Sequence, residues 1–459
     1  MTMSDWTPTL PTGAEPAYAR ILARLAADIG AGALAPGARL PTQRRLAERL
    51  GVGLGTVTRA YAEAEARGLI DAVVGRGSFV ARPRSIAPEP GGGVIDLARN
   101  LPPSAAIAPA LRQAFAALAR RSDLAARLDY APADGFAADR SAAALWLQRT
   151  SSFPSADPDR LIVTAGAQQA ITVALAAACR PGEALVVEEA TFHGTRLAAA
   201  HLGLRLAPVA MDAEGVTPEA LERAVAETGA RTAYLQPFQN PTARVMSLAR
   251  RQDIVATAQR LGVTLVEDDL YGVHVADLAL PPLAQLAPEQ VLYISGLSKS
   301  LAPGLRTGYL IASAALRARA LEALRAVAFG PPTFGPLIAT HWIESGEAFA
   351  ILAETLADLT RRTELARTLL AGHIEPMSRR ESPHLWLPLG ALEAEQVAGQ
   401  ALRAGVELTP PAAPFAPGVA VNGLRVCLGA APDLAMLERG LRVVAAALSP
   451  DRSLAEAVV

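Results

Sequence analysis

The stretch SGLSKSLAPGLRTGYL, residues 295–310, holds the only lysine of this 459-residue chain, Lys299. The chain has 43 lysine and arginine residues together, and every one except Lys299 is an arginine. A guanidinium stays protonated and cannot form an imine, whereas an amine with a lowered pKa can. We therefore expect Lys299 to serve covalent chemistry. The alternative is a surface lysine without a role.

Apolar, strand-like runs surround this stretch and alternate with helical stretches. They lie at residues 161–163, 184–187, 232–235, 264–266, 291–294 and 308–312. Alternating strands and helices are typical of an α/β fold with a mostly parallel sheet covered by helices. Beyond about residue 336, long amphipathic helical stretches mix with short strands at 384–389 and 424–428. This second pattern indicates a smaller α+β part.

Three shorter helices and a hairpin are predicted at the N-terminus. Helical spacing covers residues 16–32, and a second helix enters after Leu40-Pro41-Thr42 and closes at Gly51. A third helix is predicted from about residue 55 to residue 67. The runs 69–74 and 78–81 flank Gly75-Arg76-Gly77, as in a β-hairpin. Two helices joined by a glycine turn and followed by a hairpin indicate a winged helix-turn-helix.

A proline- and glycine-rich segment, residues 83–94, separates the two patterns and is interpreted as a linker. The linker defines a winged-helix domain at residues 14–82, called the head below. It also defines an α/β domain at residues 95–459, with a large part to about 335 and a small part at about 336–459.

The net charge of the whole chain is −1, which argues against a nucleic-acid surface over its full length. Residues 16–82, however, contain ten arginines against five acidic residues, a balance of +5. Basic charge is therefore concentrated in the head, where it favours a double-stranded DNA partner.

Hydrophobic residues make up 51% of the chain, but charged residues interrupt every apolar stretch before it reaches the roughly 18 to 20 residues of a membrane span. The N-terminus lacks a secretory signal pattern, so we expect a cytoplasmic protein. Cys179 and Cys427 fit that compartment as two unpaired thiols. His193 and His384 have no neighbouring ligands at metal spacing, so no metal site is expected.

The segment GALAPGARLPTQRRLAERLGVGLGTVTRAYAEAEARGLI, residues 32–70, together with GRGSFV at 75–80, resembles the GntR-type winged helix. In such a domain the third helix enters the major groove. The resemblance implies the following DNA contacts: Arg44, Thr56, Thr58, Arg59, Arg76 and Gly77. The family usually has Ser-Arg-x-Thr where this chain has Gly53-Leu54-Gly55-Thr56, so one expected arginine is missing.

The α/β domain resembles fold-type I aminotransferases, and the two domains together resemble MocR-type regulators within the GntR family. This resemblance implies a pyridoxal 5'-phosphate cofactor. The stretch quoted first matches the segment that holds the cofactor, so Lys299 would form a Schiff base with it. Ser298 would lie beside the cofactor, and Arg306 would bind its phosphate.

Two further motifs match the family's contacts to the cofactor ring. VEDDLYG, residues 266–272, implies that Asp268 pairs with the pyridine nitrogen and that Tyr271 meets the phenolic oxygen. QNPTA, residues 239–243, implies that Asn240 meets the same oxygen. TAGAQQA, residues 164–170, is a strand-to-helix turn of the kind that holds phosphate, which implies a cup formed by Gly166, Ala167 and Gln168.

Three more side chains match family positions. Phe192 would stack on the ring, although a phenylalanine alone more often belongs to a core. Tyr130 would reach the phosphate of a partner subunit, which implies a homodimer. Arg425 would hold an effector carboxylate with its forked guanidinium. Hydroxyl side chains are usual in the family at Gly296, Ala165 and Ala167, and these departures imply weaker cofactor binding.

The fold alone does not decide between regulation and catalysis, because one cofactor site supports both. The head favours a transcription regulator that uses pyridoxal phosphate and responds to a small amino acid or amine effector. In the homodimer the heads can cross to the partner subunit. The alternatives are an aminotransferase in which the head is secondary, and a sensor of pyridoxal phosphate itself.

Overall fold

The computed structural model describes residues 6–10, 15–31, 33–35, 37–67, 69–73, 77–80, 93–103, 107–275, 279–375 and 381–449. The chain forms two compact units, Met1–Gly93 and Val94–Val459, and each is considered by itself. Arg76 of the expected DNA contacts lies outside the described residues, as do residues 83–92 of the expected linker.

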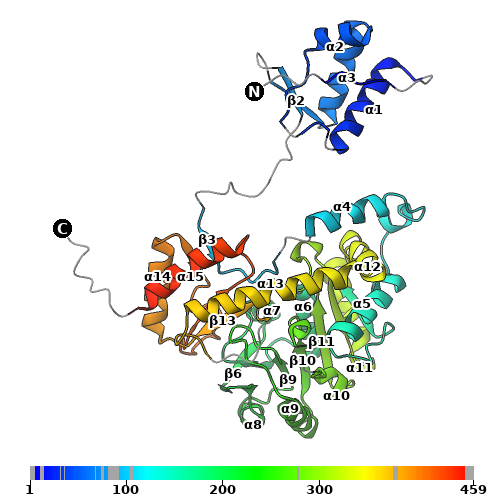
Figure 1. Ribbon diagram of the computed structural model, residues 1–459. Coiled ribbons are helices and arrows are strands. Elements are labelled where there is room, and N and C mark those ends of the chain that lie inside the picture. The colour runs from blue at the N-terminus through cyan, green and yellow to red at the C-terminus, as the bar shows by residue number, and fades with distance from the viewer. Residues whose placement is uncertain are drawn as a thin grey trace, which may run out of the picture. The chain divides into compact units, whose positions relative to one another are not determined.

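The described head consists of α1 (Ala17–Gly30), α2 (Gln43–Leu50), α3 (Leu54–Ala66), β1 (Ile70–Val73) and β2 (Gly77–Val80). Helix α2 begins where the Thr42 hydroxyl accepts a hydrogen bond from the backbone N–H of Arg45 at 3.4 Å. It ends at Gly51, whose φ of +64° lies in the left-handed region that glycine adopts without strain. The chain can therefore turn sharply into α3, and the predicted helix-turn-helix is present (Figure 1).

A small apolar core holds the head together. Ile21 and Leu25 of α1 are fully buried with Leu46 of α2 and Val57 of α3. Strands β1 and β2 pair antiparallel as the predicted hairpin. The spacing of buried residues along α1 is the one that the helical pattern predicted, and it fixes the three helices around one centre.

Seven described strands form the central sheet of the second unit, in the order β4-β12-β11-β10-β9-β5-β6. Their bounds are β4 (Leu161–Thr164), β5 (Ala184–Glu188), β6 (Arg205–Val209), β9 (Thr232–Leu235), β10 (Thr264–Asp268), β11 (Val291–Gly296) and β12 (Gly308–Ile311). Strand β12 runs antiparallel to β11 and β4, and the other neighbours are parallel. The predicted mostly parallel sheet is confirmed. Strand β6 was missed because it is an edge strand with a proline and exposed positions, not a continuous apolar run.

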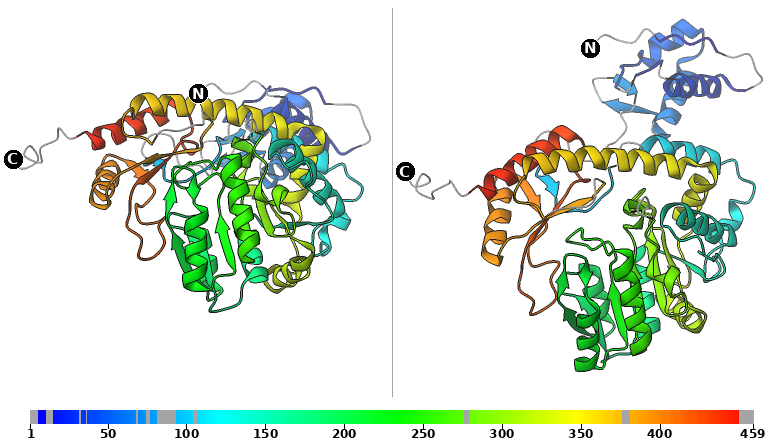
Figure 2. Two further views of the ribbon diagram at one scale, coloured as in Figure 1. Left: turned by 90° about the horizontal axis from the view of Figure 1, so that it is seen from below. Right: turned by 60° about the horizontal axis from the view of Figure 1, so that its bottom comes forward.

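Helices cover both faces of this sheet, as Figure 2 shows. One layer contains α4 (Ile107–Leu118), α5 (Ala137–Thr150), α8 (Pro218–Thr228), α9 (Leu248–Leu261), α10 (Leu283–Leu286) and α12 (Phe334–Ser345). The other contains α6 (Ala167–Ala178), α7 (His193–His201) and α11 (Ala314–Ala328). Strand β4 shows the alternation, since Leu161 and Val163 pack on the first layer and Ile162 on the second. Burial of both faces explains why the strands are apolar at successive positions.

Short elements connect these layers. They are the 3-10 helices η1 (Ala125–Leu128), η2 (Gly272–His274) and η4 (Pro303–Leu305) and the strand pair β7 (Met211–Asp212) and β8 (Gly215–Val216). Helix η2 follows the carboxyl end of β10, and η4 follows the carboxyl end of β11. Both therefore lie at the edge of the sheet where a ligand can bind.

The small part has its own core. It contains α13 (Glu347–Leu369), α14 (Ala391–Arg403), α15 (Leu434–Leu448), β3 (Ile95–Leu97), β13 (His384–Leu387), β14 (Val406–Leu408) and β15 (Leu424–Cys427). Strand β3 comes from the beginning of the unit yet pairs in parallel with β14 near its end. The long helix α13 packs against α12 at one side and α15 at the other, and so joins the two parts (Figures 1 and 2).

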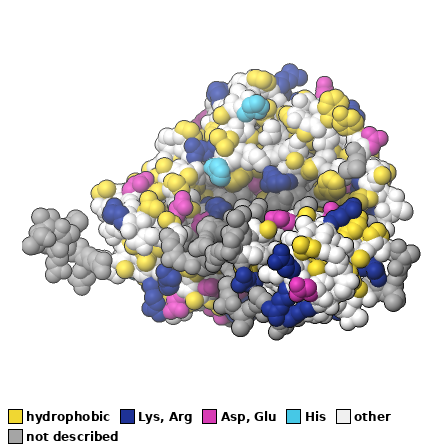
Figure 3. Space-filling model, turned by 90° about the horizontal axis from the view of Figure 1, so that it is seen from above, with side chains coloured by type: hydrophobic (Ala, Val, Ile, Leu, Met, Phe, Trp, Pro, Cys, Tyr) yellow, Lys and Arg dark blue, Asp and Glu magenta, His cyan; other side chains and the backbone are white. Residues whose placement is uncertain are grey.

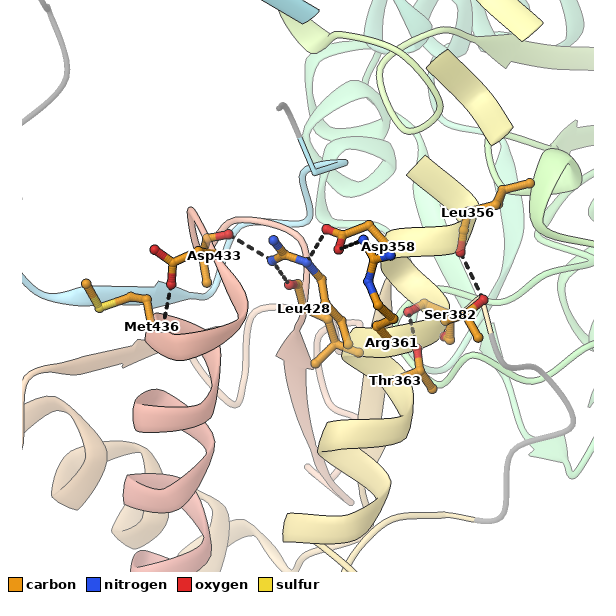
Figure 4. Close-up of polar contacts among 11 residues, drawn as sticks. Leu356, Asp358, Arg361, Thr363, Ser382, Leu428, Asp433 and Met436 are labelled. Carbon is orange, nitrogen blue, oxygen red and sulfur yellow. Dashed lines mark hydrogen bonds and ion pairs between the residues drawn. The ribbon is translucent and has the colours of Figure 1, made fainter. Parts of the chain in front are cut away.

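A buried arginine fixes α13 to the small part. Arg362 is 3% exposed, and its guanidinium donates to the carboxylate of Asp358 at 2.6 Å. It also donates to the carbonyl oxygens of Leu428 at 2.9 Å and Ala431 at 2.8 Å. Figure 4 shows Asp358 and Leu428 beside this junction. These bonds join α13 to the loop between β15 and α15.

None of the described helices is long and apolar enough to cross a membrane. Basic and acidic side chains are interspersed over the face shown in Figure 3, with hydrophobic patches between them. This surface agrees with the near-neutral charge of the whole chain.

Candidate functional site

Chemically reactive side chains gather where the central strands end. Asp268 is the last residue of β10, and Lys299 follows the end of β11 by three residues. Strands β10 and β11 are parallel neighbours, so their carboxyl ends meet at one edge. Ligands of open α/β sheets bind at this edge.

Lys299 is largely buried, and its Nζ donates a hydrogen bond to the main-chain oxygen of Asn100 at 2.7 Å. The pKa of Lys299 is lowered to about 8: burial is the largest cause, the charges of Arg425 and Arg306 act in the same direction, and Cys427 and Asp268 oppose them. Desolvation disfavours the ammonium form and so favours the nucleophilic amine. Four of the expected residues, Lys299 and the three charged side chains that shift its pKa, therefore lie close enough to interact electrostatically.

Asp268 is buried and held by two donors. The Tyr234 phenol on neighbouring β9 donates to its carboxylate, and the backbone N–H of Leu270 donates at 3.3 Å. Burial raises the pKa of Asp268 to about 6, and the hydrogen bond from Tyr234 opposes this rise. The sequence analysis missed Tyr234. The signal was available in the strand alternation, because Tyr234 pairs with Val266 and Asp268 lies two residues further on the same face.

Three backbone segments form a cradle at the N-terminus of α6. Gly166 has φ of +83°, and a Cβ there would lie 2.9 Å from the Arg306 guanidinium. A Cβ on Gly308 would lie 2.5 Å from the Gly166 carbonyl carbon and 2.8 Å from the Ala167 nitrogen. Arg306 donates to the Ala165 oxygen at 2.9 Å. The first N–H groups of a helix have no acceptor inside it, so the cradle combines free donors with a guanidinium, which suits a phosphate.

Gly296 lies where two strands approach closely. It pairs with Gly308 across β11 and β12, and a Cβ on Gly296 would lie 3.0 Å from the Thr307 oxygen. A serine or threonine here would require the backbone to give way. Strands β11 and β12 therefore approach each other too closely here for a larger side chain.

Arg425 on β15 is engaged by groups from both parts of the unit. Its Nη1 donates to Asn240 Oδ1 at 2.7 Å, and its Nη2 donates to the Ala98 oxygen at 3.1 Å. Its Nε donates to Thr409 Oγ1 at 3.2 Å. Arg425, Asn240 and Phe192 also line a cavity of about 20 Å³, room for one water. The Arg425 guanidinium thus already donates to three acceptors, and the carboxylate of a ligand would have to replace some of them.

Asn100 is a buried site residue that the sequence analysis missed. Its Nδ2 donates to the Tyr271 hydroxyl at 3.0 Å and lies 2.8 Å from Nδ1 of His384. Burial lowers the pKa of His384 well below its usual value, so this imidazole is neutral. No spacing signal marked Asn100, because it lies 171 residues from Tyr271 in the sequence.

The remaining expected residues divide into two groups. Ala167 and Ser298 are buried, and Gln168 Nε2 donates to the Gly194 oxygen at 2.8 Å, which joins α6 to α7. Tyr130 is 87% exposed, and its ring lies 6.0 Å from that of Phe329. The structure therefore does not bring Tyr130 to the site of its own chain.

This donor set fits pyridoxal 5'-phosphate. The site combines a buried amine of lowered pKa, a buried carboxylate beneath a phenol, and a glycine-lined cradle with a guanidinium. Lys299 would hold the aldehyde carbon, Asp268 the ring nitrogen, and Arg306 with the α6 N-terminus the phosphate.

The expected DNA contacts lie on the exposed side of the helix-turn-helix. Arg44 and Thr58 are exposed, Thr56 is half-buried, and Gly77 begins β2. The Thr58 hydroxyl donates to the Gln43 side chain at 2.8 Å.

Arg59 is exposed but already has a contact inside the head. Its guanidinium stacks 4.0 Å from the centre of the Tyr18 ring. Arg59 therefore also joins α3 to α1, a contact that the sequence did not predict.

Two family descriptions match the chain. Residues 17–80 match the bacterial regulatory proteins of the gntR family, and residues 92–444 match aminotransferase class I and II. The HTH-type transcriptional regulator YdeF of Bacillus subtilis is 30% identical over 454 residues, which cover 96% of each chain. The chain belongs to the GntR-type regulators that carry an aminotransferase-like domain.

Other relatives of this GntR-type regulator fit the same assignment. The HTH-type pyridoxine biosynthesis regulator PdxR of Corynebacterium glutamicum is 27% identical over 335 residues, covering 70% of this chain and 69% of its own. The crystal structure of LysN, an α-aminoadipate aminotransferase of Thermus thermophilus, matches with a TM-score of 0.69 and 24% identity over 78% of this chain and 92% of its own. The predicted aminotransferase fold is confirmed.

We expect Gly308→Ala to weaken pyridoxal phosphate binding, because the new Cβ meets backbone atoms of Gly166 and Ala167. Overpacking costs about 1 to 3 kcal/mol, and a cost of this size borne by the cofactor-bound state corresponds to roughly 5- to 150-fold in affinity. The measurement is a fluorescence titration with the cofactor. Gly304→Ala is the matched control, since a Cβ there meets nothing within 4 Å. Equal affinities in the two variants would contradict the cradle.

The rate of cofactor attachment should rise with pH and be half-maximal near the Lys299 pKa of about 8. The neutral amine attacks, and its fraction grows as pH rises through that pKa; an ordinary lysine would require about pH 10.4. Stopped-flow absorbance between about pH 6 and about pH 11 measures this, a range that includes both midpoints. A half-maximal rate near the ordinary value would rule out the desolvated amine.

Arg44→Ala should weaken DNA binding and reduce the slope of log affinity against log salt by about 1, because one phosphate contact is lost. Gel shifts at several salt concentrations give the slope. Arg67→Ala is the control, because Arg67 follows the C-terminus of α3, and the expected contacts Thr56 and Thr58 lie near the N-terminus of that helix. Arg67 also pairs with Glu63 at 2.9 Å. An unchanged slope for Arg44→Ala would remove it from the DNA contacts.

Proposed function

We propose that this regulator controls transcription by binding DNA through its head and an amino acid effector through a pyridoxal phosphate site. Bound to Lys299, the cofactor supplies an electrophilic carbon that can exchange the lysine for another amine. The observation that carries the proposal is the nearness of Lys299 and Arg425, which donate hydrogen bonds to the main-chain oxygens of Asn100 at 2.7 Å and Ala98 at 3.1 Å. An effector with an amine and a carboxylate would meet both residues.

Each residue then has a defined task. Asp268 keeps the ring nitrogen protonated, and the Tyr234 phenol stabilises the ionised form of that carboxylate. Asn240 leaves its amide N–H groups for the phenolic oxygen while its Oδ1 accepts from Arg425. Phe192, at the N-terminus of α7, supplies an aromatic face beside the cavity. The carboxylate of the effector would replace the Asn240 and Thr409 partners of Arg425.

A homodimer completes the proposal. Tyr130 and Phe329 are exposed together, and Phe115 and Phe334 are also more than half exposed. Exposed aromatic side chains of this number favour an interface between copies of the chain. In such a dimer Tyr130 would contact the phosphate site of the partner, and the heads can cross to the partner subunit.

Two other functions have specific support. The match to PdxR favours a sensor in which pyridoxal phosphate is itself the effector. The 2-aminoadipate transaminase of Thermus thermophilus, 27% identical over 311 residues, favours retained transamination. Steady turnover of an amino donor with a 2-oxo acid would support the enzyme. A DNA response to pyridoxal phosphate alone would support the sensor.

The proposal is tested by absorbance and gel shift with matched pairs of amino acid and amine, such as β-alanine and ethylamine. At saturating cofactor, the amino acid should shift the visible band and change DNA affinity by about 5-fold or more, the usual size of allosteric coupling. Arg425→Ala should abolish the preference for the carboxylated member of the pair, and Lys299→Ala should abolish the lysine-bound band. A panel of such pairs that changes neither signal would overturn the proposal.

A further inference from the structure

The segment Ala98–Asn100 contacts the two basic side chains of the site with its own main chain. The Asn100 oxygen accepts from Lys299 Nζ at 2.7 Å, and the Ala98 oxygen accepts from Arg425 Nη2 at 3.1 Å. The motifs quoted from the sequence do not include this segment. It nevertheless touches both groups that an amino acid effector would engage.

The Asn100 side chain anchors the segment in the large part of the unit. Asn100 is 7% exposed, and its Nδ2 donates to the Tyr271 hydroxyl at 3.0 Å. Its Oδ1 is buried without a hydrogen-bond partner among the described residues. An unpaired buried acceptor is unfavourable, so a donor brought near this oxygen would stabilise the segment.

The Ala98 oxygen has more donors than it needs. Thr409 Oγ1 donates at 3.0 Å and Cys427 Sγ at 3.2 Å, in addition to Arg425. A carbonyl oxygen has two lone pairs, so three donors compete for it. Arg425 can therefore leave this oxygen for a ligand carboxylate without leaving it unpaired.

We propose that Asn100 is a positioning residue through which the segment 98–100 senses whether Lys299 is free and Arg425 is engaged, and passes that state to the head. The inference rests on the proposed function. It adds the route by which the site acts on the linker.

The contacts of the segment differ between the two states of Lys299. A free lysine amine has several N–H donors, one of which reaches the Asn100 oxygen. A lysine nitrogen bonded to the cofactor carbon has at most one N–H and is held at the ring. The Asn100 oxygen therefore favours the free amine, which is the state produced when an effector displaces Lys299. Such a difference in contacts is what coupling between two sites requires.

The segment also has a direct covalent path toward the head. Gly93 is the last residue of the first unit, and β3 begins two residues later. Strand β3 pairs with β14, and the Ile95 N–H donates to the Gly405 oxygen at 2.8 Å. Because Ile95 and Leu97 belong to the core of the small part, the linker is attached to the small part. A displacement of the small part relative to Lys299 would thus move the attachment point.

Hydrogen exchange of residues 94–103 tests the sensing step in the full-length wild-type protein. Addition of pyridoxal phosphate should speed exchange in this peptide by roughly twofold or more, because the Lys299 donor is withdrawn. Methoxyamine should then reverse the change. Its nitrogen forms a C=N bond to the cofactor carbon and gives up its two protons, the bond from that carbon to Lys299 breaks, and the lysine nitrogen takes up the protons and leaves as the free amine.

Aminooxyacetate releases Lys299 in the same way but adds a carboxylate for Arg425, so it separates the two contacts. With aminooxyacetate, the amides at the Ala98 end of the peptide should exchange faster than they do with methoxyamine. Unchanged exchange while absorbance shows lysine-bound cofactor would overturn the inference alone. Absence of any lysine-bound band would overturn the cofactor proposal, and the inference with it.

Asn100→Ala tests the transmission step, with Arg99→Ala as the control from the same segment. The Arg99 side chain is 72% exposed and pairs with Asp96 on the surface. The ratio of DNA affinities with and without aminooxyacetate, at saturating cofactor, should fall from about 5-fold or more to below about 2-fold in Asn100→Ala and stay high in Arg99→Ala.

A wild-type ratio retained in Asn100→Ala would overturn the inference. A wild-type protein whose DNA affinity is the same in both states would overturn the proposed regulation itself. If Asn100→Ala does not fold, the exchange measurement on the wild-type protein still decides the sensing step.

Discussion

Burial of one amine at the carboxyl edge of a parallel sheet is the constraint on which the α/β unit depends. An amine removed from water loses its charge more easily, and burial is the largest cause of the low Lys299 pKa. The same burial requires an acceptor for the amine, which the main chain provides at Asn100. It also places Asp268 in a dry environment, where the Tyr234 phenol compensates for lost hydration. One location in the sheet thus explains three neighbouring features.

The antiparallel strand β12 has a related consequence. It pairs with β11 on one side and β4 on the other, and Gly308 at its beginning lies against Gly296 and Thr164. Glycine at both positions allows the backbones to approach closely, which brings Arg306 next to the N-terminus of α6. The glycine-lined cradle is therefore a result of strand packing.

The small part depends on residues that are far apart in the sequence. Arg362 joins α13 to the loop after β15, and β3 inserts beside β14 from the opposite end of the unit. Arg425 lies on β15 of this part yet donates to Asn240, which belongs to the large part. The candidate carboxylate site is therefore formed between two separately packed cores. A ligand held there would contact groups that belong to both cores.

The sequence by itself determined the two domain types, because periodic burial and short motifs are local properties. Helical spacing predicted α1 to α3, continuous apolar runs predicted six strands of the large sheet, and the single lysine indicated Lys299 as the candidate reactive amine. Only the tertiary structure decided what meets these residues. Asn100 lies 199 residues from Lys299, and Tyr234 reaches Asp268 only through strand pairing. Contacts of this kind depend on strand order and on the packing of distant segments, which no local pattern records.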